Sequence, residues 1–372
     1  MRLSSLNFLA STALAAFVTA AVFGQNPTPT PAVSQGETEE IRIDSKLILI
    51  PVAVIDAAGN PVQGLTKDDF IVTEEGRPQR IEAIGTAETV PLEIVLLLDI
   101  SASTGAMFQF QQQTAAQFLK SVMKPADRAT IFTIGASPVL VTPRNGSERA
   151  AEVLLTIKPT KEFTAFYDSV ATAAEFLMKN APQGSRRVMV IISDGEDTNS
   201  TRIARAIQAG YRKIGSAIDT IDAKELYALT LKNRNEASKA ERQRVLKLLQ
   251  DADTVFYSIN PAGSSYQLNS ISVFGQENME KFASETGGSA FLPRFLPVDT
   301  KDDLQNIANT RKNSEILSAI FRRLESELRA QYLVQYYSDT EFPSGRFVRT
   351  EVRLRNSRPN QIRARSGYFV KN

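Results

Sequence analysis

The stretch IVLLLDISAS, residues 94–103, joins an unbroken apolar run to a short polar cluster. The apolar half is typical of a strand buried in a parallel sheet. The polar half places the carboxylate of Asp99 and the hydroxyls of Ser101 and Ser103 directly after it. Oxygen ligands of this kind suit Mg²⁺ or Mn²⁺. The stretch therefore predicts an α/β sheet with a divalent-cation site at the end of one strand. The alternative is that the two serines cap the helix that follows.

Composition removes several kinds of chemistry from consideration. The 372 residues are 42% hydrophobic and 23% charged, which is ordinary for a globular protein with room for about two domains. They include no cysteine and no histidine. Thiolate nucleophiles, disulfides, Cys/His zinc sites and Ser-His-Asp triads are therefore excluded. The formal net charge of +2 gives no general argument for nucleic-acid or membrane binding.

The N-terminal segment 1–24 has the pattern of an export signal. Arg2 supplies a positive charge, the stretch 6–23 is largely apolar, and Val22 and Gly24 are small residues suited to a cleavage site. An uncleaved membrane anchor is the alternative, because the apolar stretch nearly reaches the length that spans a bilayer. We expect a secreted or periplasmic protein with no membrane span after signal cleavage.

Periodicity divides the remainder of the chain into five parts. Strands alternate with helices in the middle of the chain, which predicts a doubly wound, mainly parallel sheet with helices on both faces. Two adjacent apolar runs, at 129–135 and 138–142, are too close for a crossover, so one edge strand is expected to be antiparallel. The predicted parts are a Pro/Thr-rich linker at 25–40, a β segment at 41–88, the α/β domain at 89–300 with a charged helical insertion at 198–250, a helix at 301–331, and a β segment at 332–372.

The two β segments, 41–88 and 332–372, are each too small to fold alone. We expect them to pair with each other into a small β-sandwich-like domain beside the α/β domain.

Two further residues extend the predicted cation site. Asp194 follows the apolar strand at 187–193, and ligands of doubly wound sheets bind at the carboxyl ends of neighbouring strands. Asp99 and Asp194 are therefore expected to meet, and Thr164, in a loop that opens a helix, adds a hydroxyl. Capping of that helix by Thr164 and a simple turn at Asp194-Gly195 are the alternatives. Glu196, Asp197 and Asp168 are expected to support the loops.

These residues resemble the metal-ion-dependent adhesion site of von Willebrand factor type A domains. Such domains share a D-x-S-x-S sequence, a distant Thr and a distant Asp, here Asp99, Ser101, Ser103, Thr164 and Asp194. The resemblance covers about 90–300, and GLTKDDFIV at 64–72 is similar to the short β segment that precedes the domain in bacterial secreted members. Thr164 departs from the family, because it follows Glu162-Phe163 where glycines are usual. The resemblance implies that the cation is held by these five residues and engages a carboxylate of a partner protein.

The function expected from the sequence is a secreted, cation-dependent protein-binding module of the adhesion type, not an enzyme. One alternative is a structural subunit of a cell-envelope assembly. The other is a hydrolase that uses metal-bound water with Glu196 or Asp197 as the base. Arginines recur along the C-terminal strands, but no aromatic residues alternate with them, so nucleic-acid binding is not supported.

Overall fold

The computed structural model describes residues 47–101, 108–215, 220–261, 270–298, 300–356 and 360–371. The predicted signal segment, the linker and Ser103 lie outside these residues.

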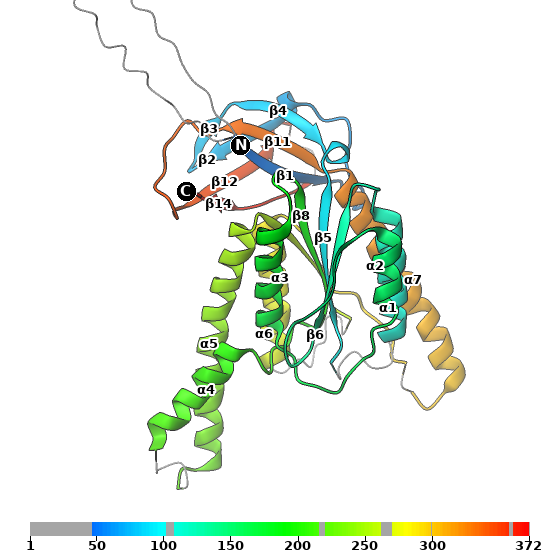
Figure 1. Ribbon diagram of the computed structural model, residues 1–372, viewed down its shortest axis with the longest axis vertical. Helices are drawn as coiled ribbons and strands as arrows, with labels where there is room; N and C mark the ends of the chain where they lie inside the picture. The colour runs from blue at the N-terminus through cyan, green and yellow to red at the C-terminus, as the bar shows by residue number, and fades with distance from the viewer. Residues whose placement is uncertain are drawn as a thin grey trace, which may run out of the picture. The chain divides into compact units, whose positions relative to one another are not determined.

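A six-stranded sheet forms the middle of the described chain (Figure 1). Its strand order is β10-β9-β8-β5-β6-β7, and every neighbouring pair is parallel except β6 and β7. This confirms the predicted mainly parallel sheet with an antiparallel edge strand. The strands are β5 (Leu92–Asp99), β6 (Arg128–Ile134), β7 (Val139–Asn145), β8 (Arg186–Ile192), β9 (Thr254–Ile259) and β10 (Ala290–Phe291).

Strand β5 is central because its sequence supplies apolar side chains to both faces of the sheet. All eight of its residues are buried. Successive side chains of a strand point to opposite faces, so Ile94 and Leu96 enter one core while Val95 and Leu97 enter the other. Complete burial of a side chain of this size stabilises the fold by about 1.5–3 kcal/mol.

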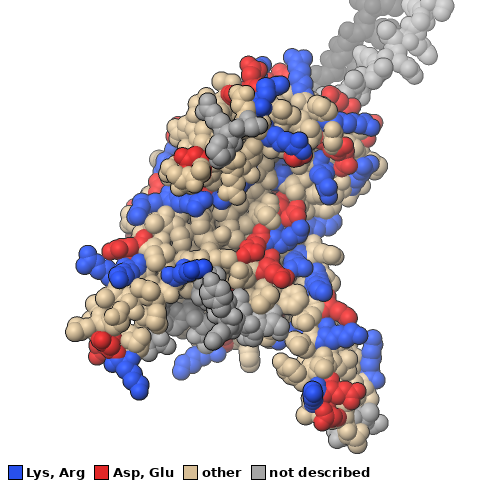
Figure 2. Space-filling view, turned by 180° about the vertical axis from the view of Figure 1, so that it is seen from behind, with Lys and Arg blue, Asp and Glu red and all other residues tan. Residues whose placement is uncertain are grey.

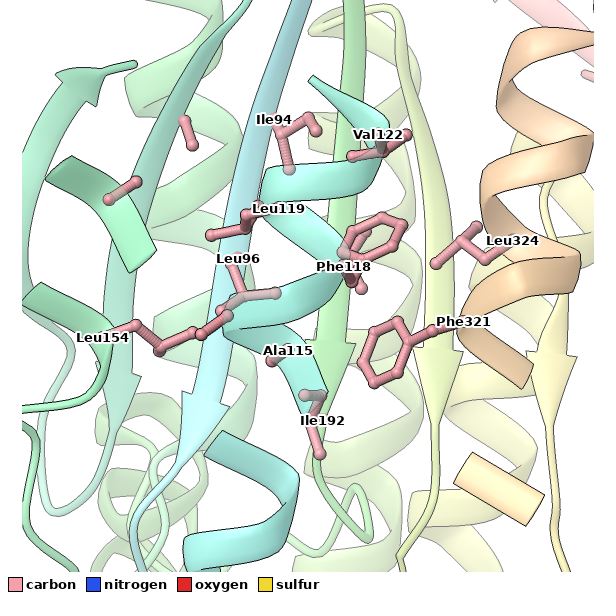
Figure 3. Close-up of a cluster of buried hydrophobic side chains, with 14 of the residues drawn as sticks. Ile94, Leu96, Ala115, Phe118, Leu119, Val122, Leu154, Ile192, Phe321 and Leu324 are labelled. Carbon is pink, nitrogen blue, oxygen red and sulfur yellow. The ribbon is translucent and has the colours of Figure 1, made fainter. Parts of the chain in front are cut away.

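Helices cover both faces of the sheet. One core contains residues of α1 (Phe108–Val122), α2 (Ser147–Leu154) and α7 (Asp303–Arg329). Figure 3 shows Phe118 of α1 beside Phe321 of α7, with ring centroids 5.0 Å apart. The other core contains residues of α3 (Phe166–Asn180) and of the two helices α5 (Ala223–Asp251) and α6 (Ser270–Thr286).

The region predicted as a charged insertion forms a helical hairpin of α4 (Thr201–Ile214) and α5 (Figure 1). The expectation of a solvated insertion needs correction for the second half of α5. Val245 and Leu249 are fully buried in the sheet core. Because α5 runs directly into β9, its C-terminal half is the crossover helix, and its N-terminal half is the part with few buried side chains.

The flanking β segments pair with each other in two antiparallel sheets, β13-β1-β11-β4 and β14-β12-β2-β3. In the first sheet Ile50 of β1 pairs with Val334 of β11, and in the second Val72 of β2 pairs with Val352 of β12. Both sheets contribute to one apolar core, as expected of a small sandwich. The strands are β1 (Leu47–Ile55), β2 (Phe70–Glu74), β3 (Arg77–Gln79), β4 (Ile81–Thr86), β11 (Tyr332–Tyr337), β12 (Phe347–Leu354), β13 (Gln361–Ala364) and β14 (Gly367–Phe369), with short 3₁₀ turns at Lys67–Asp69 and Ala87–Thr89.

A buried carboxylate links the sandwich to the α/β unit. Glu327, near the end of α7, has a fully buried side chain. It accepts hydrogen bonds from Arg363 of β13 at 2.8 Å and from Ser289 at 2.9 Å, and Arg323 lies 3.2 Å from it. The C-terminal strands are therefore joined to the α/β unit by a buried ion pair as well as by apolar packing.

Candidate metal centre

Three chain segments meet at the carboxyl ends of β5, β6 and β8. The backbone N–H of Ile100 donates to Ile134 at the end of β6, and Thr160 N–H donates to the carbonyl of Ile100. Ala165 N–H donates to Gly135, directly after β6. The loop before α3 is therefore fixed beside the end of β5, as the doubly wound topology predicts.

Asp99 lies at the centre of this edge and has no exposed surface. The hydroxyl of Ser193 donates to its Oδ2 at 2.6 Å, and Ser101 N–H donates to its Oδ1 at 2.9 Å. Burial, and after it the charge of Asp194, raise the pKa of Asp99 to about 6 against the lowering effect of the serine hydrogen bonds. Two carboxylates thus lie near each other in a site that contains little solvent.

Asp194 is largely buried and occupies a turn after β8. Its Oδ1 accepts a hydrogen bond from Glu196 N–H at 3.0 Å, and the next residue, Gly195, has a φ of +76°. A Cβ on Gly195 would lie 2.6 Å from the carbonyl oxygen of Gly275 in α6. The segment is therefore a turn packed closely on α6, and the same turn places the Asp194 carboxylate close to Asp99.

Thr164 is held by the loop that follows β8. Thr198 N–H and Asn199 N–H donate to its carbonyl at 2.8 and 2.9 Å, and its own N–H donates to Thr198 Oγ1 at 2.8 Å. Helix α3 begins after Ala165, so Thr164 is not its N-cap residue. Among the described residues its hydroxyl has no hydrogen-bond partner, and it is the group expected to face a cation.

The neighbouring carboxylates support loops, as the sequence analysis expected. Asp197 accepts hydrogen bonds from the backbone N–H groups of Tyr167 and Ser200, both at 3.1 Å, and from the Ser200 hydroxyl. Burial raises the pKa of Asp197, and these hydrogen bonds oppose that effect. Glu196 accepts a hydrogen bond from Ser272.

Sequence reasoning missed Ser193 and Gly275. Ser193 is fully buried and bonds to Asp99, although in the sequence it reads only as the last residue before an Asp-Gly turn. Its place directly before Asp194, at the end of a buried strand, is the signal that would have pointed to it. Gly275 carries no local signal, since its role is the close approach of α6 to Gly195.

The described donors fit a hard divalent cation in type. Asp99, Ser101, Thr164 and Asp194 offer carboxylate and hydroxyl oxygens, which Mg²⁺ and Mn²⁺ prefer. Within the described residues no lysine or arginine forms an ion pair with either carboxylate, and no group of three or more Asp, Glu, His or Cys side chains gathers there. A cation at this edge would therefore rely on hydroxyls and water together with two carboxylates. Ser103, the fifth predicted ligand, lies outside the described residues.

The comparison with known proteins finds a domain match that includes the residues of this site. Residues 94–196 match the model of the von Willebrand factor type A domain. No curated protein matches the chain.

No helix in the described parts of the chain has the length and apolar character needed to cross a membrane.

Several solved structures are similar to this chain at low identity. An aerotolerance-related membrane protein from Bacteroides fragilis is 15% identical, with a TM-score of 0.34 over 60% of this chain and 99% of that chain. BatB from Bacteroides thetaiotaomicron is 14% identical, with a TM-score of 0.33 over 60% and 98% of the two chains. Proximal thread matrix protein 1 of the mussel byssus, with a zinc-occupied MIDAS motif, is 10% identical, with a TM-score of 0.38 over 68% of this chain and 48% of that chain.

Proposed function

We propose that this chain, in which residues 94–196 match the model of the von Willebrand factor type A domain, is a cation-dependent protein-binding module of the adhesion type. Asp99, Ser101, Ser103, Thr164 and Asp194 would hold Mg²⁺ or Mn²⁺. The cation would engage an acidic side chain of a partner protein. We place this activity outside the cytoplasm, in a secreted or periplasmic protein whose signal segment 1–24 has been cleaved.

The observation that carries the proposal is the burial of Asp99 beside Asp194. Bringing two carboxylates together in a site of low exposure is unfavourable, and the raised pKa of Asp99 reflects that cost. A divalent cation would remove it, because it compensates both negative charges at once. The hydroxyl of Thr164, without a partner among the described residues, points to the same conclusion.

The partner chemistry follows from the small number of charged ligands. With two carboxylates and otherwise neutral donors, a bound Mg²⁺ would still attract a further negatively charged oxygen. A carboxylate from another protein is such a ligand. The site lies on the edge of the sheet where the strands end, which is the edge at which doubly wound sheets bind their ligands.

The contacts of Glu196 and Asp197 favour binding over hydrolysis. These were the two candidate bases for a metal-assisted hydrolase, and both side chains accept hydrogen bonds that fix the loop after β8. A base must be free to accept a proton from the attacking water. Hydrogen bonds engage both carboxylate oxygens of Asp197 and one of the two of Glu196.

The test is a calorimetric titration of the mature chain with Mg²⁺ and with Mn²⁺. We expect one-site binding in the wild-type protein and its loss in the Asp99→Ala and Ser101→Ala/Ser103→Ala variants. A Ser284→Ala/Ser326→Ala variant is the matched control, because both serines are exposed on other helices. Circular dichroism would verify that each variant is folded. Equal metal affinity in the Asp99→Ala variant and the wild type would refute the site.

A further inference from the structure

One side of α4 carries a stripe of arginines that borders a groove. Arg202, Arg205 and Arg212, together with the small residues Ala206 and Ala209, recur at helical spacing and line an open groove of about 590 Å³. The alanines leave room between the long cationic side chains. The part of the groove that α4 lines is thus apolar between positively charged side chains.

The positive charge of this stripe is not balanced within α4. The helix contains no acidic residue, and among the described residues Arg205, Arg212 and Lys213 form no ion pair. Arg202 pairs with Glu241 of α5 at 3.5 Å. Figure 2, the view from behind, shows basic and acidic side chains interspersed over that face.

The stability of α4 does not explain the positions of Arg202 and Arg205. Both lie near the helix N-terminus, where positive side chains interact unfavourably with the helix dipole. Arg212 and Lys213 lie at the C-terminal end, where the dipole favours them, and Arg202 pairs with Glu241, so Arg205 is the arginine that needs another explanation. An anion that binds in the groove would supply one.

The groove is connected to the candidate metal centre through the loop that follows β8. Asp168, in the first turn of α3, accepts hydrogen bonds from Thr201 N–H and Oγ1, both at 2.8 Å, and both residues line the groove. Thr201 follows Thr198 and Asn199, which hold Thr164. The negative charge of Asp168 is thus engaged by the start of α4, and the arginines extend away from the loop that carries Thr164.

We propose that this groove binds an acidic segment of the protein partner. The inference rests on the proposed function, in which one carboxylate of that partner engages the cation at Asp99. Neighbouring carboxylates of the same segment would pair with Arg202, Arg205 and Arg212. A protein segment fits better than a nucleic acid, because no aromatic side chain for base stacking lines the groove.

The test uses a fluorescein-labelled decaglutamate peptide and the mature chain with Mg²⁺, with binding followed by fluorescence anisotropy. The variant is Arg205→Glu/Arg212→Glu. The matched control is Lys232→Glu/Lys239→Glu, which makes the same change in net charge at two exposed positions seven residues apart on α5. We expect the arginine variant to bind the peptide about tenfold more weakly or worse, and the lysine variant to stay within about threefold of the wild type. The Mg²⁺ titration of the arginine variant should match that of the wild type.

Other outcomes separate the two proposals. Equal peptide affinity in the two variants, or no peptide binding by the wild type, would refute the proposal that the groove binds an acidic segment. If Mg²⁺ still binds in that case, the proposed metal site is retained. Peptide binding that needs the arginines but not Mg²⁺ would support the groove and count against the cation-dependent function. Tighter binding of an oligodeoxythymidine of equal charge through the same arginines would overturn the assignment to an acidic protein segment.

Discussion

The hydroxyl of Ser193 donates a 2.6 Å hydrogen bond to Oδ2 of Asp99 and so joins the ends of β8 and β5. Ser193 N–H in turn donates to Ile259 at the end of β9. The orientation of the central carboxylate is therefore set by a residue that is itself fixed to the neighbouring strand. Residues that orient metal ligands in this way strongly affect metal affinity.

Replacement of Ser193 tests this role. We expect Ser193→Ala to lower Mg²⁺ affinity by about tenfold, because Asp99 loses the hydrogen bond that fixes its orientation. The free energy of unfolding should fall by about 1 kcal/mol. Calorimetry with Mg²⁺ measures the first effect and urea unfolding the second. Ser284→Ala is the control, and a Ser193→Ala variant with wild-type affinity would show that the hydrogen bond is not needed for metal binding.

Gly195 allows a matched test of close packing at the metal loop. Gly195 and Gly184 have the same φ of +76°, but an added Cβ meets Gly275 only at Gly195, while nothing lies within 4 Å of it at Gly184. Gly184→Ala should therefore lower the free energy of unfolding by about 1 kcal/mol, because of its backbone conformation alone. Gly195→Ala should lower the free energy of unfolding by clearly more. It should also weaken Mg²⁺ binding, because the loop and α6 would have to move apart. Equal unfolding free energies for the two variants would contradict the contact.

Much of the fold could be predicted because its signals are local. The apolar run before Asp99 and the runs before Gly135 and Ser193 each predict a buried strand, and the topology then brings the strand ends together. The antiparallel edge strand follows from the short connection between β6 and β7. Of the predicted ligands, the structure places Asp99, Ser101, Thr164 and Asp194 at one edge.

The features that could not be predicted depend on contacts between distant residues. Helix α6 begins at Ser270. Its first turns contain Gly275 and β-branched residues, which have low helix propensity. The packing of Gly275 on Gly195 stabilises them. In α5, the buried residues Val245 and Leu249 stand among charged neighbours, so the sequence pattern did not separate the crossover helix from the exposed hairpin.

The buried ion pair between the sandwich and α7 predicts a large cost for the loss of Arg363. Its partner Glu327 has no exposed side-chain surface, and the Arg363 side chain is 15% exposed. Arg363→Ala would leave the carboxylate with a single, partly exposed arginine, and we expect a loss of about 3 kcal/mol in the free energy of unfolding. Arg353→Ala, which breaks an exposed pair on strand β12 of the other sheet, is the control and should change stability little. Urea unfolding that gave equal losses would contradict a structural role for the buried pair.

Buried tyrosines predict how stability depends on pH. Burial raises the pKa of Tyr257 well above its ordinary value of 10.0, and the charge of Glu327 raises it further. The folded protein therefore keeps this phenol protonated when the unfolded chain ionises it. The corresponding stability is fully present below about pH 10 and is lost as the pH rises above that value, by about 1.4 kcal/mol per pH unit for each such tyrosine.

Tyr336 and Tyr368 of the sandwich contribute in the same direction, since burial raises the pKa of both and both donate hydrogen bonds to Glu74. Urea unfolding at a series of alkaline pH values should thus show a steep fall in stability above pH 10. Tyr257→Phe should make that fall shallower by the share of one tyrosine, because phenylalanine has no proton to release in either state. Tyr227→Phe is the control, as Tyr227 is 68% exposed and should leave the slope unchanged. Identical slopes for the two variants would mean that Tyr257 ionises in the folded protein as readily as in the unfolded chain.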